Sequence, residues 1–380
     1  MNGTDFFPAS PTGNGRAIDQ RLIDCRRHGL PDAIGEELCR LYGNIHSSPA
    51  HLRVYGGLDT VTQAYVATHE GGARAIFLLR EEGPRLRVVN EGMRVDTAAA
   101  EAFARFVFAT APGIAAIEFH AIESAPLSLS FPLQQAVCTA EMPLALPSTV
   151  DAYIAGLGKN TRRNLRRYMD KLLQRFPSFR FDVHERNALG TADARAVIAL
   201  NRARINGKQQ AYSIDDEEER ILALLQECGL AGVGRIDGKI CCGALGYRVG
   251  DRFFFKIIGH DPQYNPWSLG ILCCFLMIRA CIERGCSEYN FMWNEYEYKF
   301  ALGARRRELA RVVIYRSRLH MLANGRMACA VARDAARHRA ASLLEMGGRL
   351  HELPAATRAA FHLLHAARSL KRGLSAWRSA

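Results

Sequence analysis

The stretch DRFFFKIIGHDPQYNPWSLGILCCFLMIRACIERG, residues 251–285, decides the fold of this chain. Its first part, 252–258, is a short run of aromatic and β-branched residues, which is typical of a buried strand. A polar turn follows, in which Asn265 has the character of an N-cap and Pro266 that of a first helical residue. The next ten or so residues are apolar on every side, so the pattern predicts a buried helix over about 266–284, directly after the strand.

The start of this helix is a predicted anion site. The first N–H groups of a helix have no partner within it and lie at the positive end of its dipole, so they bind phosphate without a basic side chain. Gly270 has no Cβ and would let a ligand approach the backbone. A pyrophosphate held in this way indicates a nucleotide-bearing ligand, and coenzyme A fits best. The residues expected to hold it are Ile258, Gly259, Trp267, Ser268, Leu269, Gly270, Ile271 and Leu272. A capped core helix without a ligand would show the same pattern.

Composition indicates a globular protein with room for two domains. The chain has 380 residues, of which 48% are hydrophobic. No apolar run approaches the roughly 20 residues that cross a bilayer, and the first residues do not resemble a secretion signal. The cysteines form no Cys-x-x-Cys pair, so reduced thiols are expected rather than disulfides or a metal site. We therefore expect a cytoplasmic protein that binds no metal.

Basic residues are concentrated in two segments, 159–175 and 321–380, within a net charge of +12. Such a balance favours an acidic partner, which could be coenzyme phosphates, a nucleotide-linked acceptor, RNA or an anionic membrane surface. In the first segment, Arg162, Arg163 and Arg166 lie on the wet side of a predicted helix. They could bind an acidic acceptor or a cofactor phosphate, or they could simply form a solvated helix face.

The order of strand and helix patterns predicts an α/β (mixed α+β) protein with two similar halves, each a mixed, largely antiparallel sheet flanked by helices. In the first half, Asp96 and Glu101 surround the corresponding helix start and would repel a pyrophosphate, so only the second half is expected to bind the cofactor. The tail is expected to pack on the enzyme or a dimer mate, to be solvated, or to touch an acidic membrane or partner. The predicted divisions are a disordered leader over 1–20, a first domain over 21–145, a second domain over 146–318 and a basic helical tail over 319–380.

Three segments together resemble the FemAB-like and CelD-like branch of the GNAT acyltransferase superfamily. They are KNTRRNLRRYMDKLLQRF (159–176), the stretch from IIGHD to EYNF (257–291) and EYEYKFALG (295–303). The resemblance implies tandem GNAT folds and acyl transfer from coenzyme A, or from aminoacyl-tRNA in peptidoglycan-building relatives, usually to an amine. The chain departs from the family pattern at Asn290, where an aspartate is usual, and at 293–296, where an Arg-Gly-Asp-Glu-like run is usual.

Attack of an amine on a thioester needs alignment, a polarised carbonyl and a base. Main-chain N–H groups near 258–260 would polarise the carbonyl. Each candidate side chain also has a structural interpretation: His260 as a turn histidine, Glu295 and Glu297 as loop carboxylates, Tyr298 as a packed aromatic ring and Lys299 as a lysine that neutralises a carboxylate. The candidate bases are His260, Glu295 and Glu297, the candidate proton donor to the thiolate is Tyr298, and the candidate ligand of a phosphate or an acidic acceptor is Lys299.

We therefore expect an acyl-CoA-dependent acyltransferase that modifies an amine or hydroxyl group of a sugar, a polysaccharide precursor or an amino compound. A homodimer and a peripheral membrane or protein contact through the tail are left open. Two alternatives remain: an aminoacyl-tRNA-dependent peptide ligase, and a non-catalytic module that binds an acidic partner. Nucleic acid is not the expected partner, because aromatic residues are not interleaved with the basic ones.

Overall fold

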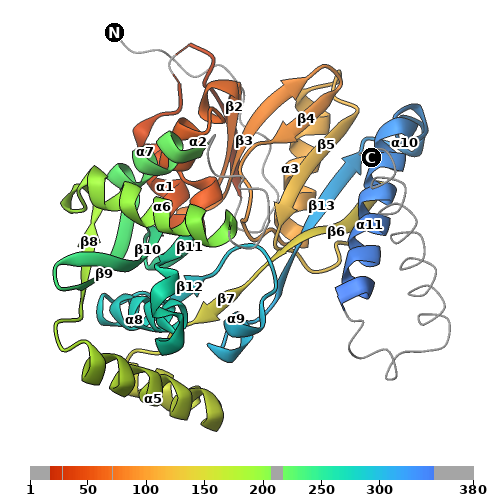
Figure 1. Ribbon diagram of the computed structural model, residues 1–380. Helices are drawn as coiled ribbons and strands as arrows, with labels where there is room; N and C mark the ends of the chain where they lie inside the picture. The colour runs from red at the N-terminus through yellow and green to blue at the C-terminus, as the bar shows by residue number, and fades with distance from the viewer. Residues whose placement is uncertain (1–17, 28, 71, 207–216, 346–380) are drawn as a thin grey trace, which may run out of the picture.

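The computed structural model describes residues 18–27, 29–70, 72–206 and 217–345. Two mixed sheets flanked by helices make up this part of the chain (Figure 1). The predicted leader falls outside it up to residue 17, and the first strand begins at Asp19. The prediction of a mixed α/β protein with two sheets is confirmed.

The first sheet has seven strands, and only its β4–β5 pair is parallel. Helices α1 (Asp32–Tyr42) and α2 (Pro49–Val54) follow its first strand, with the turns η1 (Ile45–Ser47) and η2 (Leu58–Thr60), and α3 (Thr97–Thr110) precedes its fifth. In sheet order, the strands are β1 (Asp19–Asp24), β2 (Gln63–His69), β3 (Gly72–Glu82), β4 (Arg85–Val88), β5 (Ala116–Ile122), β13 (Arg307–Tyr315) and β6 (Leu133–Glu141).

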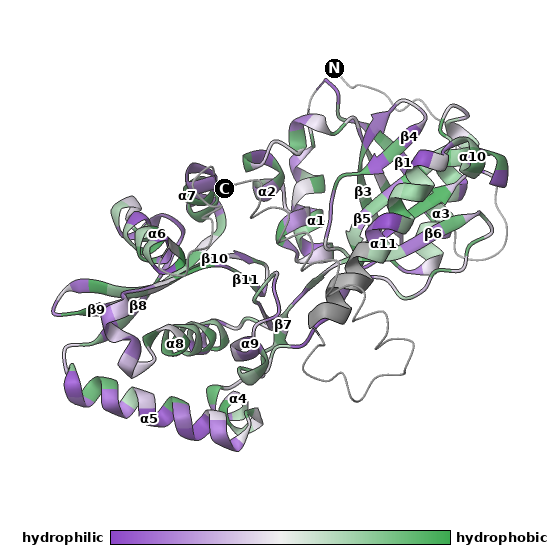
Figure 2. Ribbon diagram, turned by 45° about the vertical axis from the view of Figure 1, so that its right-hand side comes forward, coloured by the Kyte–Doolittle hydropathy of each residue, from purple (hydrophilic) through white to green (hydrophobic). Residues whose placement is uncertain are grey.

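The second sheet has six strands, and its β11–β12 pair is parallel. In sheet order they are β7 (Pro143–Ala145), β12 (Glu288–Asn290), β11 (Arg252–His260), β10 (Lys239–Val249), β9 (Gly229–Ile236) and β8 (Arg180–Glu185). Two hydrophobic clusters cover its two faces (Figure 2). One face carries α6 (Thr191–Asn206) and α7 (Glu218–Cys228), and the other carries α4 (Val150–Gly156), α5 (Lys159–Arg175) and α8 (Leu269–Glu283).

The two halves repeat one topology. Each has a strand, two helices, a three-stranded meander, a helix and then a strand parallel to the last strand of the meander. The first copy runs from β1 to β5 and the second from β8 to β12. Because α3 and α8 occupy the same place in the two copies, the repeat fits the two similar halves that the sequence predicts.

The chain passes between the sheets in both directions. β6 belongs to the first sheet, while β7, which begins two residues later, belongs to the second. After the second copy is complete, β13 returns to the first sheet and lies between β5 and β6. The sequence places this strand in the second domain, 146–318, so the structure corrects its sheet assignment. A strand order of this kind depends on long-range pairing, which local patterns do not record.

A buried ionic cluster lies at this crossing. Arg307, at the start of β13, donates to Glu141 Oε1 from Nε at 2.7 Å and to both Glu288 oxygens at 3.0 Å. Asn290 Nδ2 donates to the other oxygen of Glu141 at 2.7 Å. One guanidinium and one amide therefore satisfy two carboxylates that join β6, β12 and β13.

The halves share a hydrophobic core, because Ile45 of η1 is fully buried in a cluster with Leu245, Tyr247 and Phe254 of the second sheet. The beginning of the tail also packs on the protein. Helices α10 (Arg318–Ala323) and α11 (Gly325–Glu345) follow β13, and Val331 is buried against the first sheet. This placement favours the packed extension among the three alternatives for the tail, whose residues 346–380 lie outside the described part.

All eleven cysteines are free thiols. Within the described ranges, no group of three or more His, Cys, Asp or Glu side chains is arranged to hold a metal ion. Nor does any helix there combine the length and apolar character needed to span a membrane.

Candidate active site

At one end of the second sheet β11 and β12 part, and we call the place beyond their last paired residues the opening. The two strands pair at only three positions, and the last pair joins Phe254 to Asn290. Beyond it β11 continues to His260, whereas the chain leaves β12 through Met292, which has a φ of 55°. Main-chain groups of the last part of β11 therefore border a gap that β12 does not fill.

The start of α8 lies next to the end of β11, and its first turn is uncapped. Ser268 adopts a left-handed conformation with φ 55°, and its side chain makes no capping hydrogen bond. The first i→i−4 hydrogen bond of the helix runs from Leu272 N–H to Ser268 O, at 3.2 Å. The N–H groups of the three residues before Leu272 therefore have no i−4 partner within the helix. The first turn carries no acidic side chain.

The structure brings the eight predicted cofactor residues to this one end of the sheet. The side chains of Leu269 and Leu272 are buried in the core, so only their main-chain groups could face a ligand. Ser268, Gly270 and Ile271 are part-exposed, which leaves this short stretch of backbone within reach of solvent.

His260 forms one wall of the helix start. A Cβ on Gly270 would lie 3.0 Å from the His260 ring, so the ring packs directly against the glycine backbone. His260 Nε2 is 2.9 Å from Asn265 Oδ1, which fixes the ring orientation. Asp261 brings a carboxylate close to the site, but Gln263 donates to it from both its main chain and its side chain, at 3.0 and 2.7 Å. The uncapped N–H groups and the glycine fit the pyrophosphate of coenzyme A.

The turn before α8 differs in detail from the expected one. The sequence predicts a helix that starts at Pro266 with Asn265 as its cap, whereas Pro266 lies inside the 3-10 helix η5 (Pro262–Trp267), which Asp261 caps. The α-helix begins at Leu269. An aspartate directly after the strand captures the N–H of Gln263 first, so the chain completes a tighter turn before it enters the α-helix.

Helix α5 contacts the turn only at its C-terminal end. The Phe176 ring packs edge-on against Tyr264 at 5.3 Å and Trp267 at 5.0 Å between centroids. Arg162, Arg163 and Arg166 are exposed and lie at least ten residues earlier, or about 15 Å along the helix axis. Figure 2 shows α5 at the edge of the molecule with hydrophilic residues along it. Their contact with a cofactor or an acceptor stays a prediction.

Lys299 shapes the loop that follows β12. It is 3% exposed, and its ammonium donates to the carbonyl oxygens of Phe291, Trp293 and Asn294 at 3.0, 2.5 and 2.9 Å. Burial lowers the pKa of Lys299 to about 8, and the three carbonyl oxygens favour the charged form. The predicted contact with a phosphate or an acidic acceptor would require these hydrogen bonds to break, so Lys299 is placed as a residue that holds the loop.

The remaining candidates lie on the β12 side of the opening. Glu295 Oε1 accepts from Arg306 Nε at 2.6 Å, which ties up one of the two proposed carboxylate bases. Glu297 is exposed in the first turn of α9 (Glu297–Ala301). Burial raises the pKa of Tyr298, and nearby Arg204 offsets part of this shift, so the phenol keeps its proton at neutral pH. A proton donor to a departing thiolate requires that state.

Asn201 is a polar residue at this site that the sequence interpretation missed. It is 3% exposed on α6, and its Nδ2 donates to the carbonyl oxygen of Ile258 at 2.6 Å. Its Oδ1 is buried and has no hydrogen-bond partner among the described residues. One signal was available: Asn201 continues the buried stripe of Ala194, Val197 and Ile198 at helical spacing, where a polar side chain needs a reason.

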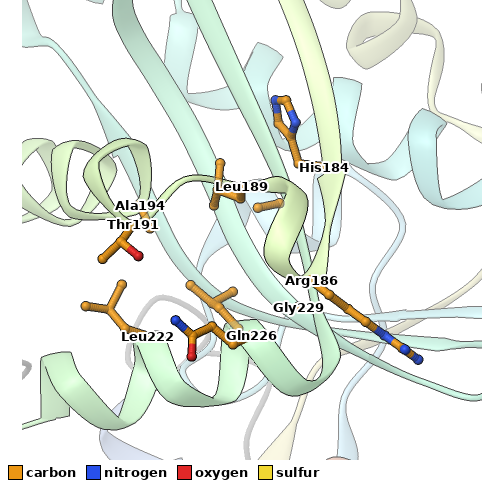
Figure 3. A pocket seen from close by; sticks show the side chains of 10 residues that line it. His184, Arg186, Leu189, Thr191, Ala194, Leu222, Gln226 and Gly229 are labelled. Atoms are coloured by element: carbon orange, nitrogen blue, oxygen red, sulfur yellow. The ribbon is translucent and has the colours of Figure 1, made fainter.

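A separate hollow lies between the start of α6 and the C-terminal half of α7, near η3 (Arg186–Ala188) (Figure 3). Leu189, Thr191 and Leu222 are among its lining residues, and its volume is about 10 Å³. That is room for about one water molecule, so this hollow is not a substrate site.

The comparisons with known proteins agree with this geometry. Residues 159–300 match a family model described as "Acetyltransferase (GNAT) domain". No curated protein matches the chain in sequence.

Among solved structures, FemX has a TM-score of 0.52 and 9% identity, covering 74% of this chain and 96% of its own. A protein of unknown function from Bacteroides thetaiotaomicron has a TM-score of 0.47 and 11% identity, covering 75% and 96%. A tandem GNAT protein from the clavulanic acid biosynthesis pathway has a TM-score of 0.35 and 11% identity, covering 78% and 98%. At these identities a likeness concerns the fold alone, and only that to FemX is close enough to use.

The fold and the site therefore define a protein with a GNAT acyltransferase fold. The segment that matches this family model includes α5, the second sheet from β8 to β12, α8 and the loop held by Lys299.

Proposed function

We propose that this protein is a cytoplasmic acyl-CoA-dependent acyltransferase of the FemAB-like and CelD-like branch. Its acceptor would be an amine or hydroxyl group of a sugar, a polysaccharide precursor or another amino compound. The observation that carries the proposal is the uncapped, uncharged start of α8 at Gly270, beside the opening between β11 and β12. Both features lie inside the segment that matches the GNAT family model.

In this proposal the main chain of 269–271 binds the pyrophosphate, and the bound molecule supplies an activated acyl thioester. The β11 edge near Ile258 orients the acyl carbonyl in the opening. Asn201 Oδ1 accepts a hydrogen bond from an N–H group of the ligand or the acceptor, which would satisfy its buried oxygen.

Proton transfer falls to residues on both sides of the opening. His260, at the helix start, is the candidate base, and Glu297 is the alternative that keeps an exposed carboxylate. Tyr298 is the candidate proton donor to a thiolate leaving group: its phenol is protonated at neutral pH, although burial raises its pKa and so makes it a weaker acid.

The second candidate donor is aminoacyl-tRNA, which the resemblance to FemAB-like proteins implies. Two observations favour keeping it: the likeness of fold to FemX, and the exposed arginines of α5. RNA held by such residues would bind with a steep dependence on salt, because phosphate contacts release counterions.

Thermal unfolding distinguishes the two donors. Acetyl-CoA and longer acyl-CoAs should raise the midpoint, since a ligand at 100 times its Kd adds about 2.7 kcal/mol of stability. Release of free thiol from acetyl-CoA in the presence of amino sugars would then measure turnover. A midpoint that moves with tRNA but with none of the coenzyme A compounds would contradict the proposal in favour of the second donor.

A further inference from the structure

A cleft in the first half is a larger cavity than the hollow near η3 and lies away from the α8 site. Its volume is about 230 Å³, and it lies between η1 and α2 on one side and β3, β4 and the segment after β4 on the other. The polar residues that line it include His46, His51, Arg80, Arg87 and Glu91. A cavity of this size accommodates a small ligand, and none of these residues belongs to the acyl-donor site.

Two imidazoles in the cleft have unsatisfied nitrogens. His46 Nε2 and His51 Nδ1 are buried and have no hydrogen-bond partner among the described residues, and the two rings meet edge-to-face with centroids 4.9 Å apart. Burial lowers the pKa of His46 to about 4 and that of His51 to about 3, so both rings are neutral near pH 7. A buried polar atom left unpaired costs about 1–3 kcal/mol, which a ligand with hydroxyl or amine groups would recover.

Two arginines on the opposite wall repel each other. Arg80 and Arg87 are direct cross-strand partners on β3 and β4, an arrangement that is unfavourable for like charges. Arg80 Nε donates to Glu82 Oε1 at 2.7 Å, but Arg85 pairs with the same carboxylate. An anion between the two guanidiniums would relieve this repulsion.

The carboxylate on the Arg87 side is also shared. Arg87 Nη2 is 3.7 Å from Glu91 Oε1, and His120 Nδ1 lies 2.9 Å from that same oxygen. Since Arg85 also pairs with Glu118, at 3.0 Å, each arginine of this wall has a carboxylate nearby, and the pair between Arg87 and Glu91 is the longest of these contacts.

One residue that lines the cleft contacts the loop after β12 through an aromatic pair. The His46 ring lies 5.5 Å from the Trp293 ring, and Trp293 belongs to the loop whose carbonyl groups Lys299 holds. On the other side, Tyr55 stacks on His51 at 4.5 Å. A ligand in the cleft would thus lie beside the loop that leaves β12, where the two strands part.

We propose that this cleft binds the acyl acceptor, a small polar molecule with a phosphate or carboxylate group. Its anionic group would lie between Arg80 and Arg87, and its hydroxyl or amine groups would hydrogen-bond to His46 Nε2 and His51 Nδ1. The existence of the site follows from the cleft itself, whereas its identity as the acceptor site rests on the proposed function.

Calorimetric titration of the full chain tests the site with glucosamine 6-phosphate as the phosphate probe and glucuronate as the carboxylate probe. One of the two probes should bind, and Arg87→Gln should raise the Kd of that probe by about tenfold or more, which is the effect of losing a hydrogen bond to a charged group. Arg74→Gln, which removes an exposed arginine of β3 outside the cleft lining, is the matched control and should change nothing. No binding by either probe, or equal losses in both variants, would overturn the site.

Two further readouts keep the outcome clear. If Arg87→Gln fails to fold, ring-nitrogen NMR of the histidines in the unmodified protein replaces it. The probe that binds should shift His46 and His51, and unchanged signals would overturn the site. Gly270→Glu should leave probe binding intact while it removes acetyl-CoA binding. If the unmodified protein binds the probe but not acetyl-CoA, the proposed function alone is contradicted. If it binds acetyl-CoA but neither probe, only the acceptor site is contradicted.

Discussion

At the scale of one residue, the contacts of Asn290 explain why this position holds an amide where the pattern that the sequence resembles has an aspartate. Its amide donates to Glu141, which is 2% exposed, and accepts from the N–H of Met292 at 2.8 Å. Burial raises the pKa of Glu141, and Arg307 offsets part of this shift. An amide can serve both neighbours, whereas a carboxylate could not donate to Glu141.

Asn290→Asp should therefore destabilise the protein at neutral pH by about 3–5 kcal/mol, the cost of an uncompensated buried charge. The two carboxylates would have pKa values above those of the unfolded chain, so the loss should shrink as the pH falls from 7 to 5 and one proton is shared. Urea unfolding at both pH values measures this. An equal loss of stability at pH 5 and pH 7 would show that the charges are not the cause.

His46 and His51 predict a second pH dependence. Their pKa values in the fold, about 4 and about 3, lie below the value of about 6.5 in the unfolded chain, so the unfolded chain takes up more protons in between. Stability should fall as the pH drops from about 6.5 to 4, by at most about 1.4 kcal/mol per pH unit for each histidine. The double substitution His46→Gln and His51→Gln should flatten the dependence in denaturant unfolding. An unchanged slope would mean that other groups carry it.

Local pattern predicted the position of some site residues and not of others. Gly270 and His260 were found because a strand, a turn and an apolar helix follow one another in sequence. The role of Asn201 depends on α6 packing across β11, so close that a Cβ on Gly259 would lie 2.3 Å from Val197 O. The three carbonyl partners of Lys299 depend on the path of a loop. Helical spacing indicates that Asn201 is buried but does not name its partner, and the path of the loop leaves no periodic signal.

At the scale of elements, β11 and α8 match their predicted positions within a few residues, because both are strongly apolar and of ordinary length. The strand β13 was recognised as a strand, but its place in the first sheet was not predicted. Antiparallel pairing with β5 and β6 joins segments about 170 to 200 residues apart, and the alternation of side chains along a strand does not name its partner.

The position of β13 predicts that the first half does not fold alone. A fragment of residues 18–145 would lack the strand between β5 and β6, leaving Ile117 and Phe119 of β5 without their neighbours. We expect it to aggregate or to unfold without a cooperative transition, as followed by circular dichroism. The matched control is the same fragment with residues 304–318 joined to it by a flexible linker, which should restore cooperativity. Cooperative unfolding of the shorter fragment would contradict this topology.

At the scale of the whole molecule, the two copies of the repeated fold differ at the start of the corresponding helices, α3 and α8. In the first half Asp96 caps α3 through the N–H of Ala99 at 2.8 Å, so a side chain occupies the helix start that α8 leaves uncapped. The sequence predicts the acidic residues at the first helix start, but it names Asn265 as a cap of the second helix, which the structure does not show. The shared core around Ile45 arises only when the halves pack together, whereas the cleft beside it is lined by residues of the first half alone.

This arrangement assigns a distinct role to each half: the second would bind the acyl donor at α8 and the first would bind the acceptor in its cleft. The loop held by Lys299 lies between them and touches the cleft through Trp293. The net charge of +12 suits two anionic ligands as well as it suits a nucleic acid, so charge alone does not decide the partner.

The most direct test is the affinity for acetyl-CoA, measured by calorimetry, of the unmodified chain, Gly270→Glu and Gly156→Glu. A Cβ at Gly270 would lie 3.0 Å from the His260 side chain, which needs to shift by a few tenths of an ångström, and a Cβ at Gly156 meets no atom within 4 Å, so both variants should fold. We predict that the unmodified chain and Gly156→Glu bind alike, whereas Gly270→Glu, with a carboxylate at the helix start, binds at least about tenfold more weakly. Equal binding by all three, or no binding by the unmodified chain, would contradict an acyl-CoA site at α8.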